Sequence, residues 1–111
     1  MPVTVVEMPT FEAAARKVKL TEAEFLEIAD YLSRHPEAGD VIKGTGGIRK
    51  MRFARPGGGK RGGYRIIHFF MTRSRPLYLL SIYAKAHKGD LSPKELKQLA
   101  KIAAAVKQEA P

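Results

Sequence analysis

Three short stretches most constrain what this chain can fold into: residues 48–54, which alternate between apolar and charged positions, and residues 64–71 and 77–84, which are mostly apolar. Stretches of this length, bounded by glycine- and proline-containing turns, are typical of β-strands. Consecutive strands joined by short connections pair most simply as antiparallel neighbours. The sequence therefore predicts an antiparallel sheet in the second half of the chain.

The first of these strands alternates between two faces, as expected when one face packs against a core. One face carries Arg49, Met51 and Phe53, and the other carries Ile48, Lys50 and Arg52. The strand is thus predicted to display two cations, Lys50 and Arg52, side by side.

The second and third of these strands are apolar on both faces, as central strands are. Arg65 and His68 are the polar exceptions in the second strand, and His68 is predicted to be a satisfied core residue. In a regular strand Tyr78 and Tyr83 face opposite sides, so only one of them is expected to reach the cationic face.

Local signals place the remaining elements around these strands. Residues 3–8 are rich in β-branched side chains and predict a strand, and the alanine-rich residues 11–18 predict a short helix. Two capping boxes begin longer helices: Thr21 with Glu24 begins a helix that ends near His35, and Ser92 with Glu95 begins a helix over 92–109. Residues 36–47 and 55–63 are predicted loops.

The predicted order is strand, two helices, three strands and a final helix. This order favours an α+β fold, with the helices packed against one face of a twisted antiparallel sheet. At 111 residues, with no internal repeat and no long linker, the chain is predicted to form one domain over residues 1–111.

Charge is distributed unevenly along the chain. All 11 acidic residues lie at or outside Asp40 and Asp90, so the interval 41–89 holds lysines, arginines and aromatic residues without a carboxylate. Lysine and arginine bind phosphates, which carboxylates repel, so this interval is suited to a polyanion such as nucleic acid. The alternative is a solvated basic face that serves solubility, given the formal net charge of +9.

Several classes of protein are disfavoured by composition. The chain has no cysteine, which excludes disulfides and thiolate metal sites. His35, His68 and His87 are scattered, and the basic interval supplies no carboxylate ligand, so no metal and no cofactor are expected. No secretory signal and no apolar stretch of the roughly 20 residues that span a membrane are evident, so a soluble cytoplasmic protein is expected.

The glycine-rich run 57–63 is not a nucleotide-binding P-loop, because no Ser or Thr follows Lys60 and a strand comes next. A hairpin tip that reaches around nucleic acid is the preferred interpretation. The cations in and beside this loop, together with one strand arginine and one tyrosine, are predicted RNA contacts: Arg49, Arg55, Lys60, Arg61 and Tyr83.

The chemistry that remains is metal-free cleavage of RNA, in which the 2′-hydroxyl attacks the adjacent phosphorus. Arginine can stabilise the charge that builds on the phosphoryl oxygens, and a lysine crowded by other cations can exchange a proton. Lys50, Arg52 and Arg65 lie on adjoining strands and could converge for this purpose. For each of them, a contact that merely positions phosphate is the alternative. His87 follows the last strand and is either an acid–base group or a surface residue.

Three segments together resemble the RelE/ParE toxin superfamily, and within it the HigB-type toxins of bacterial toxin–antitoxin pairs. They are Gly39-Asp40-Val41-Ile42-Lys43-Gly44-Thr45-Gly46-Gly47-Ile48-Arg49-Lys50-Met51-Arg52, Gly62-Gly63-Tyr64-Arg65-Ile66-Ile67 and Leu79-Leu80-Ser81-Ile82-Tyr83-Ala84-Lys85. The resemblance runs over essentially the whole chain.

The resemblance implies a RelE-like fold and a metal-independent endoribonuclease that cuts translated mRNA at the ribosome. It also implies a neutralising antitoxin, often of helix-turn-helix type. Its site residues match Lys50, Arg52 and Arg65. Two departures stand out: Arg52 replaces a second lysine and cannot act as a base, and Ala86 stands where an arginine is usual, so that Lys85 or His87 would substitute.

Two rival functions stay open at the level of sequence. The ParE branch shares the fold and inhibits DNA gyrase by binding, which requires no cluster of Lys50, Arg52 and Arg65. A non-catalytic RNA-binding module fits the charge distribution equally well.

Overall fold

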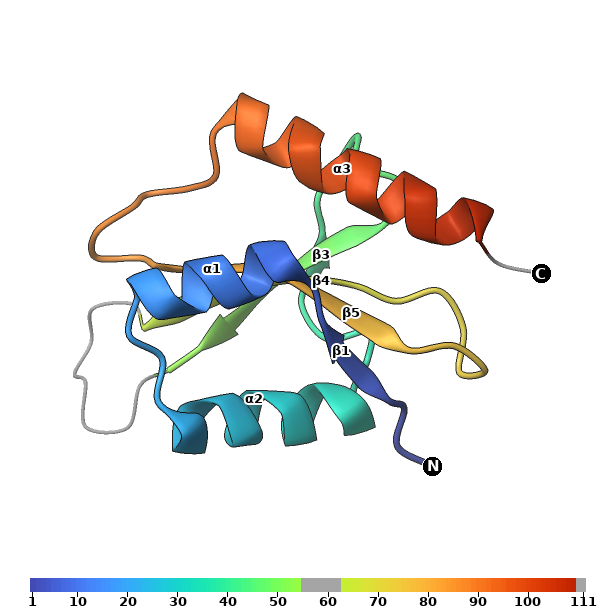
Figure 1. Cartoon of the computed structure of the whole chain (residues 1–111), viewed down its shortest axis with the longest axis horizontal. Coiled ribbons are helices and arrows are strands. Elements are labelled where there is room, and N and C mark those ends of the chain that lie inside the picture. The colour runs from blue at the N-terminus through green and yellow to red at the C-terminus, as the bar shows by residue number, and fades with distance from the viewer. Residues whose placement is uncertain (55–62, 110–111) are drawn as a thin grey trace.

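This computed structural model describes residues 1–54 and 63–109. Within these ranges the elements follow in the order β1 (Val5–Glu7), α1 (Pro9–Lys17), α2 (Glu22–Arg34), β2 (Asp40–Val41), β3 (Ile48–Phe53), β4 (Tyr64–Phe69), β5 (Leu77–Ala84) and α3 (Pro93–Gln108) (Figure 1). The predicted α+β class and the predicted order of the larger elements are confirmed. No helix in the described part of the chain is long and apolar enough to cross a membrane.

The described strands form one sheet in the order β1-β5-β4-β3-β2. The predicted antiparallel pairing of the three central strands is confirmed. Two details differ from the prediction. β1 joins the edge of the sheet parallel to β5, and the predicted loop 36–47 contains β2, which pairs antiparallel with β3. A two-residue strand is too short to leave a hydrophobic pattern in the sequence.

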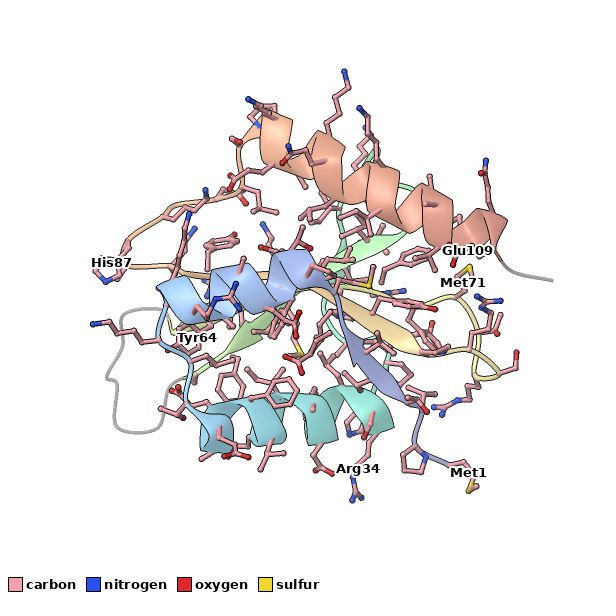
Figure 2. All side chains as sticks on the ribbon, viewed as in Figure 1. Met1, Arg34, Tyr64, Met71, His87 and Glu109 are labelled. Atoms are coloured by element: carbon pink, nitrogen blue, oxygen red, sulfur yellow. The ribbon has the colours of Figure 1, made fainter. Side chains whose placement is uncertain are left out.

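The prediction that all helices pack on one face of the sheet is wrong. Phe11 of α1 and Ile28 and Leu32 of α2 belong to the core on one face. Leu99, Ala103 and Val106 of α3 belong to a second core on the other face. Figure 1 shows α2 and α3 on opposite sides of the sheet, and Figure 2 shows side chains filling both layers. The physical reason is that β4 and β5 are apolar on both faces, so both faces must be covered.

Both predicted capping boxes are present. The Glu24 and Glu95 amides donate to the hydroxyls of Thr21 and Ser92, each over 3.1 Å, and the glutamate side chains accept from the two N-cap amides. The second box sets the start of α3 at Ser92, and residues 85–92 form the link between β5 and α3.

A bulge in β5 changes which side chains share a face. Ile67 pairs with Ser81 and His68 pairs with Leu79, so Leu80 is an extra residue opposite β4. The extra residue shifts the alternation of the strand by one position, so that Tyr78 and Tyr83 lie on the same face, where both pack in the core beneath α3. The prediction that these two tyrosines face opposite sides is therefore wrong.

Candidate functional site

A row of polar side chains crosses the three central strands on the α3 face of the sheet. Arg52 of β3 is the Cα partner of Arg65 of β4, and Arg65 is the partner of Tyr83 of β5. Lys50 lies two residues before Arg52 on the same face. We call Lys50, Arg52, Arg65 and Tyr83 the cationic row. Three of the five residues predicted to be catalytic are thus brought together, with one predicted RNA contact.

The arginines of the cationic row are directly opposed on neighbouring strands. Like charges in this arrangement destabilise a sheet, and an anion bound between them relieves the repulsion. Arg52 is exposed, whereas Arg65 is half-buried. Arginine presents a rigid fork of N–H donors that matches the oxygens of a phosphate. The pair is therefore well arranged to hold a phosphoryl group.

Asp90 joins two members of the cationic row. Its Oδ1 accepts a hydrogen bond from the Tyr83 hydroxyl at 3.0 Å and from the Leu91 amide at 2.8 Å, and it lies 3.5 Å from Lys50 Nζ. The Leu91 hydrogen bond is the largest influence that holds the pKa of the Asp90 carboxyl below its usual range. Sequence reasoning missed this residue, although Asp90 marks the end of the carboxylate-free interval.

Tyr83 is the neutral hydrogen-bond donor of the cationic row. Its side chain is almost completely buried, and burial, followed by the Asp90 hydrogen bond, raises its pKa to about 12. At neutral pH the hydroxyl therefore keeps its proton. It can donate that proton to Asp90 or to a phosphate oxygen that takes the place of Asp90.

The other predicted catalytic residues, Lys85 and His87, lie outside the cationic row. Both are exposed on the link between β5 and α3. Lys85 Nζ donates to the Gly89 carbonyl of the same link. His87 lies at one end of the molecule (Figure 2), where it lines the edge of the cavity described below.

The predicted RNA contacts are not all on one surface. Arg49 lies on the opposite face of β3, where its Nη1 donates to the carbonyls of Glu37 at 3.0 Å and Gly39 at 3.2 Å. Arg49 therefore ties the segment before β2 to the sheet. Arg55, Lys60 and Arg61 lie outside the described residues.

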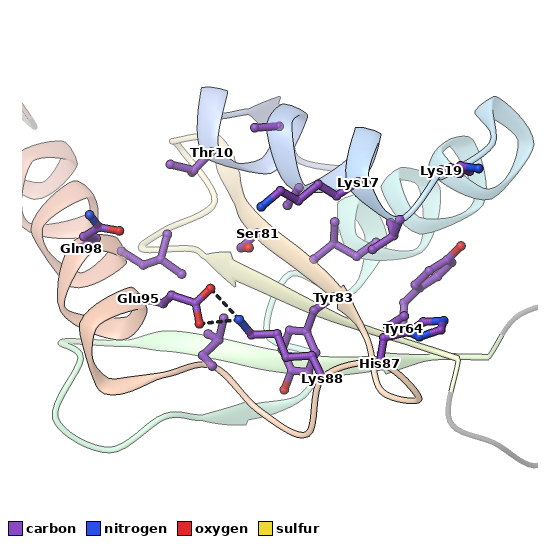
Figure 3. A pocket seen from close by; sticks show the side chains of 17 residues that line it. Thr10, Lys17, Lys19, Tyr64, Ser81, Tyr83, His87, Lys88, Glu95 and Gln98 are labelled. Carbon is purple, nitrogen blue, oxygen red and sulfur yellow. Dashed lines mark hydrogen bonds and ion pairs between the residues drawn. The ribbon is translucent and has the colours of Figure 1, made fainter.

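A cavity of about 670 Å³ opens next to the cationic row, between α1, β5, the link and α3 (Figure 3). Tyr83 forms part of its wall. Lys88 and Glu95 form an ion pair across it, with 2.6 Å between Lys88 Nζ and Glu95 Oε1. Among the described residues, no group of three histidine, cysteine, aspartate or glutamate side chains is arranged to hold a metal ion.

His68 is a core residue, as predicted. It is fully buried, and its Nε2 donates to the Ala38 carbonyl over 3.0 Å. Its Nδ1 is buried without a hydrogen-bond partner in the described structure. Burial, as the largest influence, lowers the pKa of His68 to about 4.

The low pKa of His68 predicts a loss of stability in mild acid. In the unfolded chain His68 is protonated with its ordinary pKa of 6.5, whereas in the folded protein it is protonated only at about pH 4. The unfolded state thus binds more protons in this window, and the free energy of unfolding falls as the pH is lowered from 6.5 to 4. We expect a loss of about 3 kcal/mol across the window, measured by urea unfolding at several pH values.

His68→Gln supplies the control for this prediction, because glutamine retains an N–H donor for Ala38 and does not titrate. Its stability should depend less on pH between 6.5 and 4 than that of the wild type. Equal pH dependence in the two proteins would contradict the assignment to His68. His87→Gln, a change on the exposed link, should leave the wild-type pH dependence intact.

Comparison with known proteins bears on the fold and the family of the chain. The chain resembles a solved structure of a double mutant of the E. coli toxin RelE in the free state, with a TM-score of 0.55 and 14% identity over 99% of this chain and 100% of that one. At this identity the likeness shows the fold. The family model for the RelE toxin of the RelE/RelB toxin–antitoxin system matches residues 3–110. With nearly its whole length matched, the chain belongs to the RelE toxin family of toxin–antitoxin systems.

Proposed function

We propose that this toxin is a metal-independent endoribonuclease that cleaves translated mRNA at the ribosome and so inhibits translation in the cytoplasm. The observation that carries the proposal is the cationic row, in which two opposed arginines, a lysine and a neutral tyrosine share one face. RNA supplies its own nucleophile, so a site of cations and proton donors suffices for its cleavage.

Each member of the cationic row has a role in this proposal. Arg52 and Arg65 bind the oxygens of the scissile phosphate and stabilise the charge that develops as the 2′-oxygen attacks. The Tyr83 hydroxyl donates a hydrogen bond to the same phosphate. Lys50 exchanges a proton with the substrate, which an arginine does not do at neutral pH. The bond between phosphorus and the 5′-oxygen breaks as the bond to the 2′-oxygen forms. The proton that Lys50 takes from the 2′-hydroxyl passes to the departing 5′-oxygen, so the products are a 2′,3′-cyclic phosphate and a free 5′-hydroxyl.

The residues of the link have a supporting role in the proposal. Asp90 holds the Lys50 ammonium and the Tyr83 hydroxyl in place until RNA arrives. Lys85 and His87 are exposed beside the row and contact the RNA backbone on one side of the cleaved bond. Arg55, Lys60 and Arg61 are proposed as further RNA contacts from the sequence alone.

Membership of the RelE toxin family implies an antitoxin partner. We propose that this antitoxin carries a helix-turn-helix DNA-binding domain and that the toxin belongs to the HigB branch. Both proposals rest on the sequence resemblance. They are tested by expressing the toxin with its neighbouring gene product and measuring whether growth is restored.

The proposed function is tested by induced expression followed by primer extension on a translated message. Wild-type protein should arrest growth and produce new cuts inside reading frames. The Lys50→Ala/Arg65→Ala variant should produce neither. Lys94→Ala/Lys101→Ala, which removes the same charge from exposed positions on α3, should behave as the wild type.

Other outcomes of this experiment point to the rival functions. Growth arrest with intact messages would indicate inhibition of DNA gyrase and contradict the ribonuclease. The absence of arrest in the wild type would leave a non-catalytic RNA-binding module. Cleavage by the Lys50→Ala/Arg65→Ala variant would show that the cationic row is not the site.

A further inference from the structure

The cavity beside the cationic row has the size and lining of a ligand site. Its volume of about 670 Å³ lies within the range of pockets that enclose small molecules. Apolar walls come from three directions: Ala13 of α1, Ile82 of β5, and Leu99 of α3. Apolar walls around an opening of this size suit a flat aromatic group.

Polar groups in the wall are available to a ligand. The Ser81 hydroxyl and the Gln98 amide line the cavity (Figure 3), and neither side chain makes a hydrogen bond within the described part of the chain. A hydroxyl and an amide can each donate and accept. This combination matches the mixed donors and acceptors on the edge of a nucleobase, which proteins read in unpaired RNA.

The charge around the cavity favours a negatively charged ligand, such as a nucleotide, over a cationic ligand. Glu95 is the single carboxylate among the described lining residues, and it is held by Lys88 and by the Ser92 amide. Lys17 and Lys19 line the same cavity. With Glu95 already paired, these two lysines leave the rim positive, as phosphate-bearing ligands require.

Tyr83 connects the cavity to the cationic row. Its hydroxyl reaches Asp90 beside Lys50, while the residue lines the cavity. A phosphate on Arg52 and Arg65 would therefore have the base of its own or the next nucleotide at the mouth of the cavity.

We propose that the cavity between α1, β5 and α3 binds one nucleobase of the RNA whose phosphate lies on the cationic row. The inference rests on the proposed function and deepens it, because it assigns a base-recognition site to the enzyme. Occupation of the cavity places one nucleotide next to the cleaved bond. The cavity thereby contributes to the choice of cleavage position, which phosphate contacts alone do not specify.

The test uses a short 2′-O-methyl RNA, which cannot be cleaved, and matched oligonucleotides in which one nucleotide at a time is abasic. Affinities for the full-length wild-type protein are measured by NMR titration at low salt. Loss of the base at one position should weaken binding about tenfold, the size expected for one stacked base. Loss at positions outside the cavity should have a smaller effect.

Ala13→Phe fills the cavity from an exposed position on α1 and should abolish this tenfold difference while retaining binding of the abasic oligonucleotide. Ala104→Phe is the matched control, because Ala104 is an exposed helix alanine that does not line the cavity. The control should keep the tenfold difference. Thermal melting of both variants checks that each one is folded.

The outcomes separate this inference from the proposed function. If Ala13→Phe retains the full base dependence, the cavity is not the base site, whatever the enzyme does. If Ala13→Phe leaves RNA binding unaltered and instead prevents neutralisation by the antitoxin, the cavity is a protein-docking site and the inference is overturned. If Arg65→Ala binds every oligonucleotide as the wild type does, the proposed function itself fails.

Discussion

Replacing Arg65 with alanine is expected to lower the rate of RNA cleavage by about a hundred- to a thousandfold, the usual effect of removing one donor that stabilises transition-state charge. Arg65 stands at the centre of the cationic row, between Arg52 and Tyr83. Its loss leaves the phosphate with one arginine instead of two. The measurement is the rate of cleavage of a translated message by purified protein.

The fold should survive this change, because alanine removes one of two like charges opposed across β3 and β4. Arg34→Ala is the matched control: Arg34 is exposed on α2, where its one ion-pair partner among the described residues is Asp30, one turn earlier, and it extends away from the sheet (Figure 2). The control should change the cleavage rate less than twofold. Growth arrest by Arg65→Ala at the wild-type level would refute the assignment of Arg65.

Truncation after Leu91, which removes α3, is expected to unfold the protein. The helix buries Leu99, Ala103 and Val106 against one face of the sheet. Without it, that face would expose four fully or almost fully buried side chains: Ile48, Ile67, Phe69 and Leu80. The other core cannot compensate, because it lies on the opposite face. Far-UV circular dichroism and thermal melting of the fragment provide the measurement.

A graded variant tests the same contact in the full-length chain. Leu99→Ala should lower the free energy of unfolding by about 2–5 kcal/mol, the cost of deleting a buried leucine side chain. Lys101→Ala, an exposed position on the same helix, should change it by less than about 0.5 kcal/mol. A truncated fragment that melts cooperatively near the wild-type temperature would show that α3 is dispensable.

Features that depend on neighbouring residues could be predicted from the sequence. The ranges of β3, β4 and β5, both capping boxes and the end of α2 next to Pro36 agree with the structure within a few residues. The placement of Lys50 and Arg52 on one face of β3 follows from the two-residue period of a strand. Each of these features is set by local backbone preferences or by periodicity, which the sequence contains in full.

Features that depend on distant segments were decided only by the tertiary structure. Asp90 contacts Lys50, which lies 40 residues earlier in the chain. The contact forms because the link that follows β5 lies on the side of the sheet that carries the cationic row. The bulge at Leu80 turns Tyr83 toward the same side, although strand periodicity alone placed Tyr78 and Tyr83 apart. The second helical layer exists because both faces of β4 and β5 must be shielded from water.

The sequence by itself thus determined the strands, the caps and the cations that one strand displays, since these result from short-range preferences. The tertiary structure decided that Arg65 and Tyr83 extend this display across the sheet, and that Asp90 contacts Lys50 and Tyr83. The physical reason is that strand register and layer packing are collective properties. They are fixed by the burial of two cores at once, which no single segment of the chain encodes.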